Sequence, residues 1–123
     1  MQPLINQESS RQSICVGLIT GNHVIRTGLH MILGTDPFIS KIVDIPVGVQ
    51  ARNIVIREKP QVIIVDLELS DADPTAVIRE LRMASTDTRI LVLSGLNDSK
   101  STVDALSAGA EGVVLNVQPP AVL

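Results

Sequence analysis

Hydrophobic positions gather in four short, unbroken runs along the chain. The runs are residues 14–19, 62–65, 90–93 and 113–115, and β-branched side chains are frequent in them. Continuous apolar runs of this length are typical of strands covered on both faces, as in a parallel sheet. Residues 39–45 alternate more between apolar and polar positions, which predicts a fifth strand at an edge of the sheet.

Amphipathic segments separate these runs and predict helices. The segments are residues 23–33, 47–58, 74–84 and 98–108. The first has one apolar stripe at helical spacing, made of Val24, Ile25, Gly28, Leu29, Ile32 and Leu33. The second places Val47 on its apolar face, and the last has only a thin stripe of Val103 and Leu106. Alternating strands and helices predict an α/β fold with a doubly wound parallel sheet.

Local signals mark where these helices begin and end. Asn22 is a side-chain acceptor suited to an N-cap, and Asp73 is another, followed by Pro74 at the first helical position. Gly34 is predicted as the C′ residue that ends the first helix, and Gly109 as the residue that ends the last.

Length and composition predict one domain with an aliphatic core. The chain has 123 residues, is 45% hydrophobic and contains a single phenylalanine. Residues 1–12 are polar and are interpreted as a flexible leader, and residues 13–123 as the domain. No run approaches the roughly 18 apolar residues of a membrane span. We therefore expect no membrane association and a cytoplasmic location.

Charge and cysteine usage exclude further classes. The net charge is −3 and no run of Lys or Arg occurs, so this segment gives no sign of binding nucleic acid. Cys15 is the only cysteine, which rules out an internal disulfide and fits a reducing compartment. Its position in an apolar run predicts a small buried hydrophobic residue.

Polar or small residues follow the predicted strands at the edge where sites of α/β sheets usually lie. Thr20 and Gly21 follow the first strand, Asp66 the third, Ser94 the fourth and Asn116 the fifth. Because the carboxyl ends of parallel strands meet at one edge, we expect these residues to converge there.

Four segments in order give the chain a resemblance to a known family. They are VIRTGLHMIL, PQVIIVDLELSDAD, TRILVLSGLND and DALSAGAEGVVLN. From about Ile14 to Leu123, the chain resembles a CheY-like response-regulator receiver domain of the LuxR/NarL-type branch. The resemblance implies a five-stranded sheet of order 2-1-3-4-5 with helices on both faces. Pro120 would lie in the first turn of a fifth helix, which we expect to be truncated.

The resemblance also implies roles for individual residues. Asp66 matches the phosphorylated aspartate, and Ser94 matches the switch Ser/Thr. Thr20 and Gly21 stand where the family has two acidic residues that hold Mg²⁺. Asn116 stands at the position of the family's lysine.

These departures predict an atypical receiver. Val113 stands at the position of the switch aromatic, so the usual coupling of that ring to the switch hydroxyl is not expected. Mg²⁺ neutralises charge during phosphoryl transfer and prefers several oxygen ligands, whereas one carboxylate with neutral neighbours binds it feebly. Asp71 could replace a lost ligand, while Asp73 is better explained as a cap and His23 as a surface residue. We expect no bound metal, no cofactor and no catalytic residue.

The favoured function is an atypical receiver domain of a LuxR/NarL-type transcriptional regulator in two-component signalling. We expect a homodimer, because a truncated last helix would leave apolar surface exposed, and a histidine kinase is a candidate partner. DNA would be bound only through a C-terminal domain that is absent from this chain. Two alternatives stay open: conventional phosphorylation at Asp66, and a small-molecule sensor using Thr20, Gly21, Ser94 and Asn116 in the vacated pocket. An enzyme is not expected.

Overall fold

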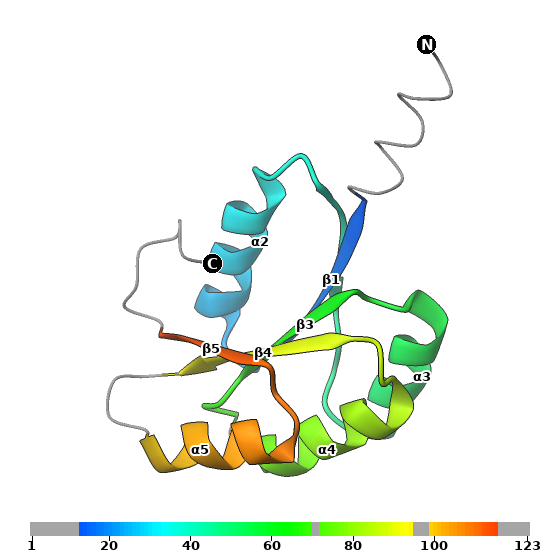
Figure 1. The fold of residues 1–123 in the computed structure, drawn as a ribbon. Coiled ribbons are helices and arrows are strands. Elements are labelled where there is room, and N and C mark those ends of the chain that lie inside the picture. The colour runs from blue at the N-terminus through cyan, green and yellow to red at the C-terminus, as the bar shows by residue number, and fades with distance from the viewer. Residues whose placement is uncertain (1–12, 70–71, 95–98, 116–123) are drawn as a thin grey trace.

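The sheet and its connections follow the predicted order. The computed structural model describes residues 13–69, 72–94 and 99–115. The strands are β1 (Ile14–Ile19), β2 (Ile39–Asp44), β3 (Val62–Asp66), β4 (Arg89–Ser94) and β5 (Gly112–Leu115). They form one parallel sheet of order β2-β1-β3-β4-β5 (Figure 1). The doubly wound fold, its strand order and the edge position of β2 are thus confirmed.

Helices cover the two faces of the sheet unequally. The helices are α2 (His23–Gly34), α3 (Val49–Glu58), α4 (Pro74–Ala84) and α5 (Ser99–Ala108). In the described part of the chain, α2 packs on one face and α3, α4 and α5 pack on the other (Figure 1). The described residues do not include residues 1–12, Asp71, Asn116 or the expected start of a fifth helix at Pro120.

The core explains why the strands read as unbroken apolar runs. On β3, Ile63 and Val65 belong to the cluster under α3, α4 and α5, whereas Ile64 belongs to the cluster under α2. Leu29 and Leu33 of α2 complete the second cluster. Because successive side chains of a strand point to opposite faces, a sheet covered on both faces requires an apolar residue at nearly every strand position.

Two predicted N-caps are confirmed. The Asn22 side chain accepts hydrogen bonds from the backbone N–H groups of Val24 and Ile25, at 2.9 and 3.1 Å. The Asp73 carboxylate accepts one from the N–H of Thr75 at 3.1 Å, with Pro next to the cap. Each cap supplies an acceptor to helix N–H groups that have no partner within the helix.

The predicted helix ends are confirmed at Gly109 and wrong at Gly34. Gly109 follows α5 with φ of 124°, a conformation that favours glycine. Gly34 is instead the last residue of α2, and Thr35 caps the helix in a right-handed conformation. Thr35 Oγ1 donates to the carbonyl of Ile32 at 2.8 Å, so this helix ends without a left-handed glycine.

Parts of the predicted apolar stripes are also wrong. Val24 is 80% exposed, because it lies about 140° around the helix from Leu29 at 100° per residue. On α5, Val103 and Leu106 are exposed and Ala105 is fully buried, so the smallest of the three side chains packs on the core. Val47 precedes α3, whose N-cap is Gly48, and is exposed as well.

Candidate functional site

Three of the predicted site residues lie at the same edge of the sheet. Thr20 directly follows β1, Asp66 ends β3 and Ser94 ends β4. The register brings the ends together, since Ile19 pairs with Val65 and Asp66 pairs with Leu93. Thr20, Asp66 and Ser94 are 6%, 4% and 1% exposed, so this carboxyl edge holds a buried polar group on each of three adjacent strands.

Both oxygens of the Asp66 carboxylate accept hydrogen bonds. The hydroxyl of Thr20 donates to Oδ2 at 2.8 Å, and the backbone N–H of Glu68 donates to Oδ1 at 2.9 Å. Thr20 Oγ1 in turn accepts the N–H of Asn22 at 3.1 Å. Hydrogen bonds to an ionised acceptor are stronger than those between neutral groups, so these two donors compensate part of the cost of burying the carboxylate.

Ser94 connects the carboxyl edge to a helix. Its hydroxyl lies 3.2 Å from that of Thr102 on α5. Val113, at the position of the switch aromatic, lies on β5 and packs against the core beneath α3, α4 and α5. Asn116 lies outside the described residues.

Gly21 lies beside Thr20 with room around it. It is exposed, its φ is not in the left-handed region, and a Cβ built on it would meet no heavy atom within 4 Å. Neither backbone strain nor crowding therefore requires a glycine at this position.

Sequence reasoning missed a charged cluster beside this edge. Arg26 of α2 donates through Nη2 to the carbonyl of Thr20 at 2.5 Å, and its Nε lies 3.9 Å from Asp44 Oδ1. The same Asp44 oxygen lies 2.9 Å from His30 Nε2. Arg26 follows the Asn22 cap by four residues, which places it one helical turn above the cap. This spacing is the one feature of the sequence that could have indicated that Arg26 lies beside the edge.

A cavity of about 590 Å³ opens between these residues. We call it the carboxyl-edge cavity. Its wall is made of the β1–α2 turn, Arg26, the end of β2 with the following loop, and Leu69 after β3. The Asp66 carboxylate does not line this cavity. Thr20 lines the cavity and its hydroxyl donates to Asp66.

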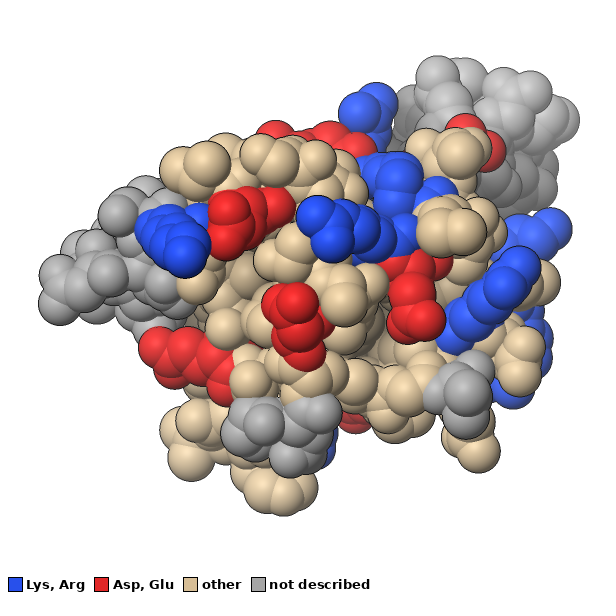
Figure 2. Space-filling model, turned by 90° about the horizontal axis from the view of Figure 1, so that it is seen from below, with Lys and Arg blue, Asp and Glu red and all other residues tan. Residues whose placement is uncertain are grey.

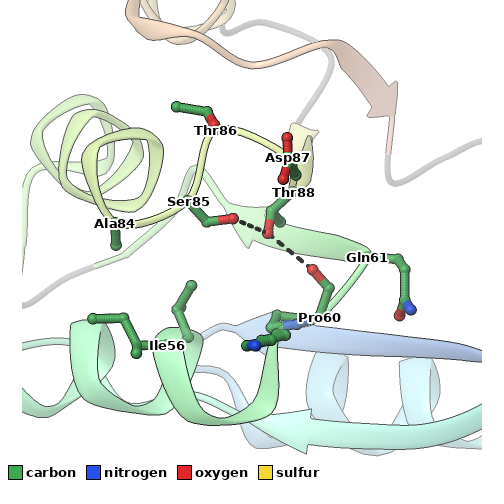
Figure 3. A pocket seen from close by; sticks show the side chains of 10 residues that line it. Ile56, Pro60, Gln61, Ala84, Ser85, Thr86, Asp87 and Thr88 are labelled. Carbon is green, nitrogen blue, oxygen red and sulfur yellow. Dashed lines mark hydrogen bonds between the residues drawn. The ribbon is translucent and has the colours of Figure 1, made fainter.

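A second cavity, of about 450 Å³, lies at the opposite edge of the sheet and is called the amino-edge cavity (Figure 3). It lies between the last turns of α3 and α4 and is lined by residues 55–56, 59–61 and 84–88. The Thr88 hydroxyl donates to the carbonyl of Pro60 at 2.9 Å and lies 2.9 Å from Ser85 Oγ, as Figure 3 shows. These hydroxyls contact one another or the backbone rather than presenting a reactive group.

Cys15 lies near the amino edge, at the start of β1. It is half-buried rather than buried as expected, and burial raises the pKa of its thiol. A raised pKa keeps the sulfur protonated and weakly nucleophilic at neutral pH. This cysteine therefore has the character of a packing residue.

Acidic and basic side chains are interspersed on the face formed by α3, α4 and α5 (Figure 2). Among the described residues of this face, such mixing leaves no extended positive patch of the kind that binds nucleic acid. Among the residues described, no three His, Cys, Asp or Glu side chains form a group that could hold a metal ion. Within the same residues, every helix is too short or too polar to cross a membrane.

Comparison with known proteins agrees with the geometry. The family model of the response regulator receiver domain matches residues 16–121. The uncharacterized transcriptional regulatory protein YhcZ of Bacillus subtilis is 28% identical over 99 residues, which are 80% of this chain and 46% of that protein. The nitrate/nitrite response regulator protein NarL of Escherichia coli is 27% identical over 112 residues, 91% of this chain and 52% of that protein.

The solved structures agree with the fold. A two-component response regulator of the LuxR family from Aurantimonas sp. SI85-9A1 superposes with a TM-score of 0.76 at 22% identity, over 89% of this chain and 78% of that one. This chain spans about half the length of the curated relatives that it matches. The matched family model and the buried aspartate at the carboxyl edge lead to one conclusion: the chain belongs to the family of response regulator receiver domains, and its relatives are regulators of the NarL/LuxR type.

Proposed function

We propose that this receiver domain is a regulatory module whose Asp66 is not phosphorylated in the Mg²⁺-dependent manner. The observation that carries the proposal is the hydrogen bond from the Thr20 hydroxyl to Asp66 Oδ2. Thr20 matches the position of the family's first acidic residue. The Asp66 carboxylate is therefore contacted by a neutral hydroxyl instead of lying beside a second, metal-binding carboxylate.

The chemistry of phosphoryl transfer supports this proposal. A carboxylate that attacks a phosphoryl donor must approach a dianion, and Mg²⁺ normally neutralises that charge. Mg²⁺ prefers carboxylate oxygens in an octahedral shell, whereas Thr20 offers a hydroxyl that already donates to Asp66 and Gly21 offers no side chain. The residues at this edge therefore fit Mg²⁺ poorly, and we derive no step through the ion.

The decisive experiment offers the chain a phosphoryl donor. The wild-type chain, Asp66→Asn and the double variant Thr20→Asp/Gly21→Asp are incubated with acetyl phosphate and Mg²⁺, and intact mass is measured. We expect no phosphoryl adduct on the wild type and an Asp66-dependent adduct on the double variant. Gly21 has room for the added carboxylate. A stoichiometric adduct on the wild type that is absent from Asp66→Asn would contradict the proposal.

Magnesium binding provides the control for that result. A titration with Mg²⁺ alone, followed by NMR amide shifts near Asp66, separates failure to bind the ion from failure to react. We expect the double variant to bind Mg²⁺ at least about tenfold more tightly than the wild type, a difference of about 1.4 kcal/mol. Equal affinities would contradict the role given to Thr20 and Gly21.

The partners of the module follow from its relatives, which are transcriptional regulators about twice its length. We propose that DNA is contacted by another domain of the whole protein and that a histidine kinase is a candidate upstream partner. A gel-shift assay with the present chain should show no DNA retardation at physiological salt. Retardation of DNA by this chain alone would contradict the proposal that another domain binds the DNA.

We also propose that the domain self-associates. Two apolar side chains three residues apart on α5 support this, since Val103 is 60% exposed and Leu106 is 44% exposed. Sedimentation velocity over a concentration series should show a reversible dimer, weakened by Val103→Ser/Leu106→Ser and unchanged by Lys100→Ser. A strict monomer at all concentrations would contradict the proposal.

A further inference from the structure

The carboxyl-edge cavity carries opposite charges on its wall. Arg26 and Asp44 both line it, with 32% and 47% of their side chains exposed. Their closest atoms, Nε and Oδ1, are 3.9 Å apart, which is a long ion pair rather than a hydrogen bond. Asp44 Oδ1 also lies 2.9 Å from His30 Nε2. Both side chains are partly exposed, so each can still be reached from the cavity.

Arg26 has capacity for another acceptor. A guanidinium has five N–H donors. Within the described residues, Nη2 donates to the carbonyl of Thr20 and Nη1 lies 3.3 Å from the ring of His23. A planar guanidinium held in this way is well suited to bind a carboxylate.

The remainder of the wall is largely apolar. Pro46, Val47 and Leu69 line it beside the charged pair, and Val47 is 38% exposed although it is apolar. The volume of about 590 Å³ lies within the range of known small-molecule sites. The cavity thus combines one cation, one anion and an apolar surface.

We propose that the carboxyl-edge cavity binds a free α-amino acid with an apolar side chain. Arg26 binds its carboxylate, Asp44 binds its ammonium group, and Val47 and Leu69 contact its side chain. A simple anion would face Asp44 and a simple cation would face Arg26, so the pair of charges selects a zwitterion. This site goes beyond the proposed function, and binding there does not require phosphorylation of Asp66.

Hydrogen bonds lead from the cavity to Asp66. Arg26 donates to the carbonyl of Thr20, and the hydroxyl of the same residue donates to the buried carboxylate. A ligand carboxylate that draws the guanidinium into the cavity competes with the Thr20 carbonyl. Binding at the cavity is thereby communicated to the position at which receiver domains receive their signal.

The binding test uses matched probes that differ in charge. The chain is titrated with L-leucine, with 4-methylpentanoate, which lacks the ammonium group, and with 3-methylbutylamine, which lacks the carboxylate. Amide shifts of Gly21, Gly48 and Leu69 are followed by NMR. We expect saturable binding of leucine and at least about tenfold weaker binding of each truncated probe, because each leaves one wall charge unpaired.

Variants locate the site. Arg26→Gln and Asp44→Asn should each weaken leucine binding about tenfold or more, while Arg89→Gln, an exposed arginine at the start of β4, should leave it unchanged. Circular dichroism and thermal unfolding of each variant without ligand check that the fold is retained. Asp66→Asn should still bind leucine, which separates this site from the phosphorylation question.

Two results would overturn the inference. One is the absence of saturable shifts with leucine, valine, methionine and phenylalanine. The other is leucine binding that Arg26→Gln and Asp44→Asn leave unchanged in folded protein.

Discussion

The two edges of the sheet treat their polar groups in different ways. At the amino edge, Arg82 donates to the carbonyls of Thr88 and Gly109, both at 2.7 Å, and pairs with Glu111. The Thr88 hydroxyl donates to Pro60. These contacts join α4, β4 and the turn before β5, so the polar groups of this edge serve mainly to hold elements together.

At the carboxyl edge, some polar groups are buried, and others line an open cavity. Asp66 is held by one hydroxyl and one backbone N–H, and Arg26 and Asp44 face a cavity of about 590 Å³. Polar groups therefore mainly join elements at the amino edge, whereas at the carboxyl edge the charged side chains of Arg26 and Asp44 stay exposed beside a cavity. Variants at the two edges should therefore differ in how much they lower the free energy of unfolding.

The largest loss of stability is expected at the amino edge, from Arg82→Met. The change keeps the apolar stem and removes the guanidinium, which leaves three carbonyls, including that of Thr86, and the Glu111 carboxylate without this donor. We expect the free energy of unfolding in urea to fall by about 3 kcal/mol. Arg79→Met, at an exposed position of the same helix, is the control and should cost no more than about 0.5 kcal/mol. Similar losses for both variants would contradict the proposal that the contacts of the Arg82 guanidinium stabilise the amino edge.

A smaller loss is expected at the carboxyl edge, from Thr20→Val. Valine has nearly the same shape but cannot donate to Asp66 Oδ2, so a buried carboxylate loses one of its two donors. We expect a loss of about 2 kcal/mol in urea unfolding. Thr20→Ser keeps the hydroxyl and should recover most of this difference. If Thr20→Val were as stable as wild type, the Thr20 hydrogen bond would not be what holds the carboxylate.

Thr88→Val removes a buried hydroxyl at the amino edge whose hydrogen-bond acceptor is neutral. Thr88 is 3% exposed and donates to the Pro60 carbonyl. We expect a loss of about 1 kcal/mol, less than at Thr20, since the acceptor carries no net charge. Thr86→Val, exposed in the same loop, should be close to neutral by the same measurement. A larger loss for Thr88→Val than for Thr20→Val would reverse the ranking.

Much of the fold could be predicted because its signals are local. Runs such as residues 62–65 showed strands covered on both faces, and Asn22 and Asp73 showed where helices begin. The carboxyl ends of the strands also predicted that Thr20 and Asp66 would lie at one edge. Their roles in phosphorylation stay predictions.

The charged wall of the cavity could not be predicted in the same way. Arg26 lies on α2 and Asp44 ends β2, and only the packing of that helix beside the edge strand brings them within 3.9 Å. Helical periodicity also failed on α5, where Ala105 is buried and Leu106 exposed. Which side of a weakly apolar helix faces the sheet depends on the fit of its neighbours, and a thin stripe does not determine it.

The smallest effect in the comparison is a pH dependence near the amino edge. Hydrogen bonds from Lys41 and then Arg57 lower the pKa of the Glu58 carboxyl, at the end of α3, below its ordinary value of 4.5. A carboxyl whose pKa is lower in the folded state stabilises the fold above that ordinary value, and the contribution is lost as the pH falls through the folded-state pKa. The stability difference between wild type and Glu58→Gln should therefore be present at pH 7 and shrink below pH 4.5.

The measurement is urea unfolding of both proteins across this range, with the Glu58 carboxyl followed by NMR. Lys41→Met, which removes the first of the two donors, should raise the pKa of Glu58 toward its ordinary value. Lys100→Met, at an exposed position of α5, should not move it. A difference that is the same at every pH would mean that Glu58 acts by packing rather than by charge. The charge of Glu58 would then contribute nothing to the stability of the amino edge.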